Sequence, residues 1–393
     1  MRDLILQAKN APIIIDPGSS GVVPFPGDIT REQVALESGE SLAELQKKDD
    51  KAYSQRKMTE GLIKILKGLY DSGEVQGVIA VGGGQGTAIA TAAMQALPIG
   101  LPKVMVSTVA CGKTTFGPYV GDKDITMIHS VADVSGLNRV TKPIITQAVA
   151  AVMAMASAKL DDVFSKVSIG LTMTGVVTPG AMVVRDELEK QGFEVIVFHG
   201  NGIGTQAMEE LVAQGKIQGV VDYSPHDVID GLFGGLMPAP PNRMLAEGLK
   251  AIPYVVVPGC ADMLLHEWRQ DWPAELANRA YVRHTPTHTH FRSTYEEMSA
   301  VAHFIAQRLN EGEGPRAALI PLRGFSMMNQ QGKPLYDAHA NQGYIDTLRA
   351  ELSPAVRLVE VDGHVNDAGF ARETAKVFME LWQCYQVRGA KVG

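Results

Sequence analysis

The stretch Gly77-Val78-Ile79-Ala80-Val81-Gly82-Gly83-Gly84-Gln85-Gly86-Thr87 decides the fold class of this chain. Its apolar run at 78–81 predicts a buried strand, and the glycines that follow predict a tight turn. The small residues at 87–96 continue at helical spacing and predict a helix. A strand that passes through glycines into a helix is the basic unit of α/β proteins with parallel sheets.

The glycine turn also predicts a binding site for an anion. Glycine lets backbone N–H groups approach a ligand, and the N-terminus of a helix carries the positive end of its dipole. We therefore expect a phosphate group to be held by the turn and the start of the helix, that is by Gly82, Gly83, Gly84, Gly86 and Thr87. The spacing is neither G-x-G-x-x-G nor G-x-x-x-x-G-K-[ST], so a turn that serves only close packing is the alternative. The same mismatch disfavours a dehydrogenase.

The alternation of strand-like and helix-like segments predicts two doubly wound parallel sheets. A chain of 393 residues exceeds one ordinary core, so we expect domains at 1–160 and 161–393, with the ligand in the cleft between them. The last helix, at about 367–384, is expected in the second domain or packed back on the first. Other helices are expected at 51–71 and 141–160, and residues 22–50 are expected to be irregular. Strands are expected at 12–16, 78–81, 103–108, 125–131, 167–173, 195–199, 219–223, 254–259, 317–322 and 357–361.

Composition excludes several classes of protein. The net charge is −7 and no run of lysine and arginine occurs, which argues against nucleic-acid binding. No apolar stretch of 18 residues occurs, so we expect no membrane span. The distant cysteines Cys111, Cys260 and Cys384 predict reduced thiols and a cytoplasmic protein. Cys260 follows a strand and has Asp262 nearby, but spacing ties no histidine to it, so we do not expect a catalytic cysteine.

Hydroxyls and a lysine follow the strand expected at 103–108. Ser107 and Thr108 end this strand, and Lys113 lies in the loop behind it, followed by two threonines. A lysine before hydroxyls resembles the end of a P-loop, where the lysine binds phosphate and a hydroxyl binds Mg²⁺. We expect Ser107, Thr108 and Lys113 to close the phosphate site opposite the glycines. A solvated lysine in a flexible loop is the alternative.

Basic side chains follow strands of the second half as well. His199 ends a strand ahead of a second glycine-rich loop, Arg323 follows another strand, and His364 follows the last one. Because ligands bind beyond the carboxyl ends of parallel strands, we expect these three residues to supply positive charge and acid–base catalysis. Asp367 is expected either to orient the His364 imidazole or to cap the last helix.

The segment 284–292 holds the densest histidine cluster. If it is one extended strand, His284, His288, His290 and Arg292 share a face. Imidazoles at this spacing fit Zn²⁺ or Fe²⁺. An anion bound by Arg292 and a plain surface strand are the two alternatives.

Segments spread in order over nearly the whole chain resemble one family. They are VIAVGGGQGT at 78–87, LPKVMVSTVA at 101–110, DITM at 124–127, GLNR at 136–139, VVVPG at 255–259, PLRG at 321–324 and HVND at 364–367. Together they resemble the largely uncharacterised bacterial and plant family that includes the ATP-binding N-terminal region of the tomato mosaic virus resistance protein. The resemblance implies two Rossmann-like subdomains, dimerisation and nucleotide binding. The family keeps a His, a Pro and an Arg like His284, Pro286 and Arg292, so His288 and His290 are additions, which weakens the metal interpretation.

The leading interpretation is a protein that binds ATP or a related nucleotide, with Mg²⁺ as an accompanying ion, and acts as a metabolic enzyme of unnamed reaction. Arg292 is expected to join the ligand site from the second domain. We expect a homodimer or higher homo-oligomer and a small phosphate or carboxylate ligand. One alternative is a non-catalytic module whose protein-binding surface is stabilised by nucleotide. The other is a metal-dependent hydrolase or lyase that uses His284, His288 and His290.

Overall fold

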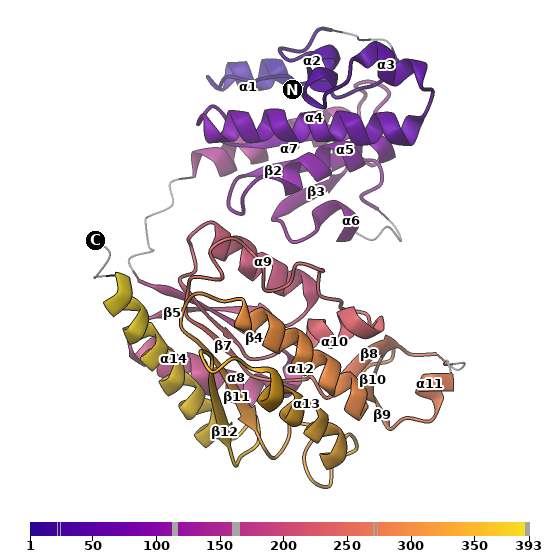
Figure 1. Cartoon of the computed structure of the whole chain (residues 1–393). Helices are drawn as coiled ribbons and strands as arrows, with labels where there is room; N and C mark the ends of the chain where they lie inside the picture. Colours follow the sequence, from indigo (N-terminus) through magenta and orange to yellow (C-terminus); the bar gives the residue numbers. More distant parts are fainter. Residues whose placement is uncertain are drawn as a thin grey trace. The chain divides into compact units, whose positions relative to one another are not determined.

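The computed structural model describes residues 1–21, 23, 25–111, 117–158, 166–269, 272 and 274–389, with 388 and 389 by backbone only. The chain divides into an amino-terminal unit, Met1–Asp161, and a carboxy-terminal unit, Asp162–Gly393. Each unit has its own parallel sheet, so the expected α/β class is confirmed (Figure 1). Within the described ranges, no helix combines the length and the apolar character that crossing a membrane requires.

The amino-terminal unit is built on a parallel sheet in the order β1-β2-β3. The strands are β1 (Val78–Gly82), β2 (Lys103–Ser107) and β3 (Ile125–His129), close to their predicted positions. Side chains of the central strand β2 alternate between the two faces of the sheet. Val104 and Val106 pack with α7 (Thr141–Ser157), whereas Met105 packs with α5 (Gly84–Gln95). The predicted strand, glycine turn and helix therefore form as a unit.

An outer layer of helices covers α5. It comprises α2 (Arg31–Glu37), α3 (Leu42–Lys47) and α4 (Lys51–Asp71), which share one apolar cluster with α5. The expectation that 22–50 is irregular was therefore wrong for α2 and α3. Both helices start with a capping box, formed by Thr30 with Gln33 and by Ser41 with Glu44, a signal that was present in the sequence.

Three smaller features complete the amino-terminal unit. Helix α1 (Arg2–Gln7) precedes the expected strand at 12–16. That strand is reduced to one isolated bridge, in which Ile15 pairs with Ile29. Helix α6 (Gly117–Val120) lies before β3.

The carboxy-terminal unit contains a six-stranded parallel sheet in the order β12-β11-β7-β6-β4-β5. The chain enters at β4, places β5 on one side of it, and then places every later strand on the other side. The connections therefore change direction between β4 and β6, which is where doubly wound sheets bind ligands. The strands are β4 (Ser168–Met173), β5 (Glu194–His199), β6 (Gly219–Asp222), β7 (Tyr254–Val256), β11 (Arg316–Pro321) and β12 (Arg357–Val361).

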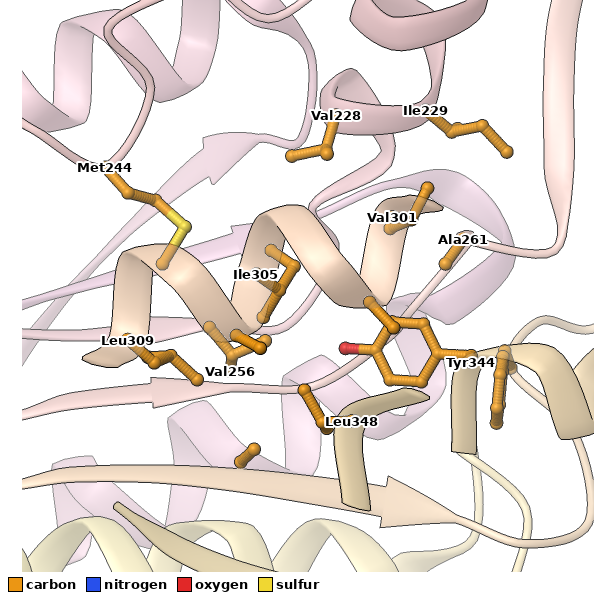
Figure 2. Close-up of a cluster of buried hydrophobic side chains, with 14 of the residues drawn as sticks. Val228, Ile229, Met244, Val256, Ala261, Val301, Ile305, Leu309, Tyr344 and Leu348 are labelled. Atoms are coloured by element: carbon orange, nitrogen blue, oxygen red, sulfur yellow. The ribbon is translucent and has the colours of Figure 1, made fainter. Parts of the chain in front are cut away.

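Helices cover both faces of this sheet. On one face, α9 (Gly202–Ala213), α10 (His226–Phe233), α12 (Tyr295–Asn310) and α13 (Ala338–Glu351) enclose a core that includes Val256 (Figures 1 and 2). On the other face, the short helix η1 (Gly175–Val177), α8 (Thr178–Lys190) and α14 (Ala368–Gly389) pack over Val255. Helix α14 contacts α8, β7 and β11.

A small antiparallel sheet in the order β8-β10-β9 adds to the carboxy-terminal unit. It is formed by β8 (Met263–Glu267), β9 (Tyr281–Arg283) and β10 (His288–Arg292), with α11 (Ala274–Ala277) before β9. The expectation of one extended strand over 284–292 was therefore wrong in its first half, where the chain turns. The turn forms because the Thr285 hydroxyl accepts hydrogen bonds from the amides of Thr287 and His288, at 3.2 and 2.9 Å.

Candidate functional site

The glycine turn of the amino-terminal unit leaves its backbone open. Gly83 precedes α5 and no side chain caps the helix. Gly82 is required by the fold, because a Cβ there would lie 2.9 Å from the Gly86 Cα. A Cβ on Gly84 would only touch the Val109 side chain at 3.9 Å, and a Cβ on Gly86 would meet nothing within 4 Å. Neither of these two glycines has a positive φ, so neither backbone geometry nor packing among the described residues gives a reason for them.

The amide groups of this turn are the donors that an anion would use. The first bond of the helix joins the Thr87 N–H to the Gly83 carbonyl at 2.7 Å. The preceding amides, of Gly84, Gln85 and Gly86, have no acceptor among the described residues, as is usual for the first turn of a helix. The turn therefore presents free N–H groups at the positive end of α5.

The hydroxyls expected at this site have two different roles. Thr87 Oγ1 and Ser107 Oγ lie 2.6 Å apart, both residues are fully buried, and Ser107 also accepts from the Val109 amide at 3.1 Å. These two residues hold the turn against β2. Thr108 is less buried and its hydroxyl lies beside the turn, 3.7 Å from where a Gly83 Cβ would be. Lys113 lies outside the described residues.

The second glycine-rich loop, which follows His199, differs from the first. A Cβ on Gly200 would clash with the Ser224 carbonyl, and one on Gly202 would clash with the Pro238 carbonyl. The Asn201 side chain caps α9 by accepting from the Gly204 amide at 2.7 Å. Close packing and capping therefore account for the glycines of this loop, while the His199 imidazole lines a cavity.

That cavity, which we call the histidine pocket, lies at the change of direction between β4 and β6. Its volume is about 130 Å³. Its walls come from the ends of β4 and β5, the start of α10, the loop after β7, strand β8 and the β9–β10 turn. The lining residues are Thr174, Gly175, Val176, His199, His226, Met237, Cys260, Met263, Leu265, His284, His288 and His290. The structure thus joins His199 to the 284–290 cluster.

The imidazoles of the histidine pocket have unused nitrogen atoms. His226 is 3% exposed and His290 is 9% exposed. The Nε2 atom of His226 and the Nδ1 atom of His290 have no hydrogen-bond partner among the described residues. The ring centroids lie 6.3 Å apart, and the His226 Nε2 atom is 3.9 Å from the Asp230 carboxylate.

Burial controls the protonation of these side chains. It lowers the pKa of His290 to about 3, with further repulsion from His226, His284 and His288. Burial also lowers the pKa of His199, again helped by His226. His290 is therefore a neutral imidazole at pH 7.

Cys260 lies in the wall of the histidine pocket with a strained backbone. Its φ is +64°, which is unusual for a residue with a side chain. The sulfur lies 2.9 Å from the Thr174 hydroxyl. Burial, helped by Asp262, raises the pKa of the thiol to about 12, so the group is a protonated thiol and not a ready nucleophile.

Three residues expected to act in catalysis or ligand binding make contacts within the carboxy-terminal unit. Arg292 donates to the backbone carbonyl of Asp262 at 2.7 Å and to the Asn341 side chain at 2.6 Å. The His364 Nε2 atom contacts the Ser326 carbonyl at 2.9 Å, and Arg323 pairs with the exposed Asp362 at the surface. None of the three lines the histidine pocket.

The segment after β12 supports the histidine pocket from behind. The Asp367 carboxylate accepts from the His364 backbone amide at 2.7 Å, so it does not orient the imidazole. The imidazole Nδ1 accepts from the Asn366 amide at 3.1 Å. The Asn366 side chain donates to the Val176 carbonyl at 3.0 Å and accepts from the Gly180 amide at 3.2 Å. This segment therefore fixes the turn after β4.

Sequence reasoning missed His226. It offered a metal site at His284, His288 and His290 as an alternative, which the structure does not support. Among the described residues, no three His, Cys, Asp or Glu side chains are arranged to bind a metal ion. His226 follows β6 in the same way that His199 ends β5, so the rule of polar residues at strand ends would have found it.

Two family descriptions cover nearly the whole chain. Residues 1–161 match the N-terminal domain, and residues 166–382 the C-terminal domain, of the uncharacterised protein family UPF0261. The chain belongs to the UPF0261 family. The boundary between the two matches agrees with the division of the structure into two units.

Members of the UPF0261 family from bacteria and from a plant are similar to this chain. A UPF0261 protein of Clostridium tetani is 37% identical over 385 residues, which is 98% of this chain and 95% of the relative. The UPF0261 protein RA0729 of Rhizobium meliloti is 36% identical over 95% of this chain and 93% of its own length. The ToMV resistance protein Tm-1(GCR237) of Solanum lycopersicum is 34% identical over 82% of this chain, but that match covers only 44% of the tomato protein. The resemblance to the family of the tomato protein is thereby confirmed.

Proposed function

We propose that the amino-terminal unit binds ATP or a related phosphoryl ligand at the turn between β1 and α5. The observation that carries the proposal is the pair of glycines at 84 and 86. Glycine inside a helix costs about 0.5–1 kcal/mol relative to alanine, and no described residue gives a steric reason for either glycine. A phosphate that approaches the backbone closely supplies that reason, because a Cβ would block it.

The electrostatics of the turn agree with this ligand. Three amides without an acceptor point out of the first turn of a twelve-residue helix, and this arrangement stabilises negative charge. A helix N-terminus selects for an anionic group and carries no preference for a particular nucleobase. The nucleotide part of the proposal therefore depends on the resemblance to the ATP-binding region of the plant family member.

The test is a thermal-shift titration of the full chain with ATP, ADP and inorganic phosphate, with and without Mg²⁺. The variant Gly84→Val is the probe, because the nearest described atom to a Cβ at this position is on the Val109 side chain, at 3.9 Å. Gly68→Val is the matched control, since Gly68 is an exposed helical glycine of α4 with nothing within 4 Å. We expect ATP to stabilise the wild type and the Gly68 variant but not the Gly84 variant. Equal stabilisation of all three proteins would place the ligand elsewhere.

A second assay on the same purified protein distinguishes an enzyme from a non-catalytic module. ATP incubated with the protein and analysed by chromatography is consumed by an enzyme, alone or with a co-substrate. A module in which nucleotide only stabilises a protein-binding surface returns ATP unchanged. We propose the enzyme, because the carboxy-terminal unit carries a pocket lined by imidazoles.

A further inference from the structure

The histidine pocket has the size of a small organic acid. Its volume of about 130 Å³ corresponds to about four water molecules at 30 Å³ each. It lies at the carboxyl ends of adjacent parallel strands, at the change of direction of the sheet, where ligands of such folds bind. All its lining residues belong to the carboxy-terminal unit, whereas the glycine turn belongs to the amino-terminal unit.

One wall of the histidine pocket is bare backbone. Gly175 has no side chain, so its peptide backbone itself lines the pocket. A Cβ there would meet nothing within 4 Å, and its φ is not positive, so the fold does not require glycine. The amides of Gly175 and Val176 have no acceptor among the described residues, whereas the next amide, of Val177, bonds to the Thr174 carbonyl at 3.1 Å. These two N–H groups lie in the turn before α8, whose Gly180 amide is already satisfied by the Asn366 side chain, so they are the donors left for one carboxylate.

The opposite wall supplies groups for the rest of the ligand. His226 and His290 are more than nine-tenths buried, and each has a ring nitrogen without a partner in the described part of the chain. Such nitrogens complete their hydrogen bonds when a hydroxyl or carbonyl group enters. Met237, Met263 and Leu265 offer an apolar surface between these polar walls.

The charge of the lining limits the ligand further. The lining, as far as the described residues show it, includes no lysine or arginine. A phosphate dianion, which such cations usually neutralise, is therefore a poor match, whereas a single carboxylate is well served by two amides. His290 does not compensate a dianion either, because burial keeps its imidazole neutral at pH 7.

We propose that the histidine pocket binds a short-chain 2-hydroxy or 2-oxo monocarboxylic acid. Its carboxylate lies on the amides of Gly175 and Val176, and its 2-oxygen lies at the imidazoles of His226 and His290. The short alkyl part contacts the methionine and leucine side chains. This assigns to the carboxy-terminal unit a ligand of its own, distinct from the phosphoryl ligand proposed for the amino-terminal unit.

The experiment is isothermal titration calorimetry of the full chain with lactate, pyruvate and 2-hydroxybutyrate. Lactamide and inorganic phosphate are the control ligands. Lactamide lacks the negative charge of a carboxylate, and phosphate carries more negative charge than a monocarboxylate. Gly175→Val fills the carboxylate position in open space, and Gly369→Val is the matched control at an exposed glycine of α14 with nothing within 4 Å. His290→Gln is a second test variant. It removes one imidazole from the opposite wall and leaves the backbone wall at Gly175 unchanged.

We expect heat of binding with at least one of the three acids and none with lactamide. We expect Gly175→Val to weaken binding at least about tenfold, as losing charge-assisted hydrogen bonds does, and Gly369→Val to leave it unchanged. The Gly84→Val variant, which is designed to lose ATP, should still bind the acid. Binding of phosphate or Zn²⁺ but of no acid would overturn the proposal, and so would binding of the acids that neither Gly175→Val nor His290→Gln weakens.

Discussion

The two glycine-rich turns look alike in sequence but differ in what their glycines do. The turn at 82–86 keeps glycine at two positions where a side chain would meet almost nothing. The turn at 200–204 uses glycine because neighbouring carbonyl groups lie where a Cβ would be. The comparison teaches that a glycine cluster after a strand indicates a ligand only where the fold itself has no need of it.

The two turns are also supported differently. A pair of neutral hydroxyls, Thr87 and Ser107, holds the first turn. Buried charges hold the second, because Thr205 of α9 donates to Asp227, which also accepts from Arg243. Five variants test this difference between the two turns. Each variant changes one turn or the unit that contains it, and the unchanged unit serves as an internal reference.

The largest effect is expected for Arg243→Met. The guanidinium is fully buried and binds the carboxylates of Asp222, Asp227 and Glu209, which would remain as uncompensated charges. Breaking such a network costs about 3–5 kcal/mol, measurable as a loss in the urea midpoint of the carboxy-terminal unit. Arg357→Met, which removes an exposed pair with Glu380, is the control and should change little. Equal effects of the two variants would mean that the buried charges do not hold the second turn.

Acid should weaken the carboxy-terminal unit before the amino-terminal one. Only His129 of the ten histidines lies in the amino-terminal unit. The folded pKa of His290, about 3, lies below the ordinary 6.5, so the unfolded chain binds more protons between these values. Stability is therefore present above pH 6.5 and falls toward pH 3, by up to about 1.4 kcal/mol per pH unit. Urea midpoints measured from pH 7 to 4 should show this slope in the wild type.

The matched variants for the pH series are His290→Gln and His303→Gln. The first removes the buried imidazole and should flatten the slope. The second removes an exposed imidazole paired with Glu351 and should leave the slope in place. A slope that survives His290→Gln would assign the acid sensitivity to another group.

Gly202→Ala should destabilise the second turn. The added methyl group would clash with the Pro238 carbonyl, and overpacking of this kind costs about 1–3 kcal/mol. Chemical denaturation followed by circular dichroism measures the loss. Gly369→Ala, at an open position of α14, is the control that should not lose stability.

Thr87→Val should weaken the first turn by a smaller amount. It removes one buried hydroxyl, while Ser107 keeps its bond from the Val109 amide, so the expected cost is about 1 kcal/mol. The exposed Thr146, whose hydroxyl bonds within α7, provides the control Thr146→Val with almost no cost. ATP binding, as proposed for this turn, should survive in Thr87→Val, because the hydroxyl is engaged with Ser107 and supports the turn. Complete loss of binding in a folded variant would contradict that role.

The smallest effect should have the opposite sign. Gly86→Ala adds a methyl group in open space inside α5 and should stabilise the ligand-free protein by up to about 1 kcal/mol. The same methyl group should weaken ATP binding in the thermal-shift assay. Gain of stability together with loss of binding would distinguish a glycine kept for a ligand from one kept for packing. A loss of stability at Gly86 would remove the difference between the two turns.

Much of the fold could be predicted because its strands are buried apolar runs that end in glycine or polar residues. β1 and β4 were found to within a residue or two for this reason. The short helices α2 and α3 were missed because six or seven residues are too few to show a helical period, although each has a capping box. The turn at 284–287 was missed because its Thr285 hydroxyl competes with the strand for backbone amides, which a period-2 pattern does not reveal.

Less of the candidate site could be predicted, because it depends on which strand ends become neighbours. His199 and the histidines at 284–290 are far apart in the chain and meet only through the sheet order. Arg292 looked like an anion-binding residue, yet its partners Asp337 and Asn341 are 45 and 49 positions away and no local pattern shows them. Position along a strand predicted where polar groups gather. It did not predict which of these groups would be hydrogen-bonded within the fold.

The contacts of Asn366 have a consequence for how the protein is made. This residue completes the wall behind Val176 and Gly180, across separations of 190 and 186 positions. Contacts of such sequence separation form late and slow folding, because a long loop must close before they contribute. The histidine pocket should therefore acquire its shape only after residue 366 has left the ribosome, at the same late stage of synthesis at which β12 and α14 complete the core of this unit.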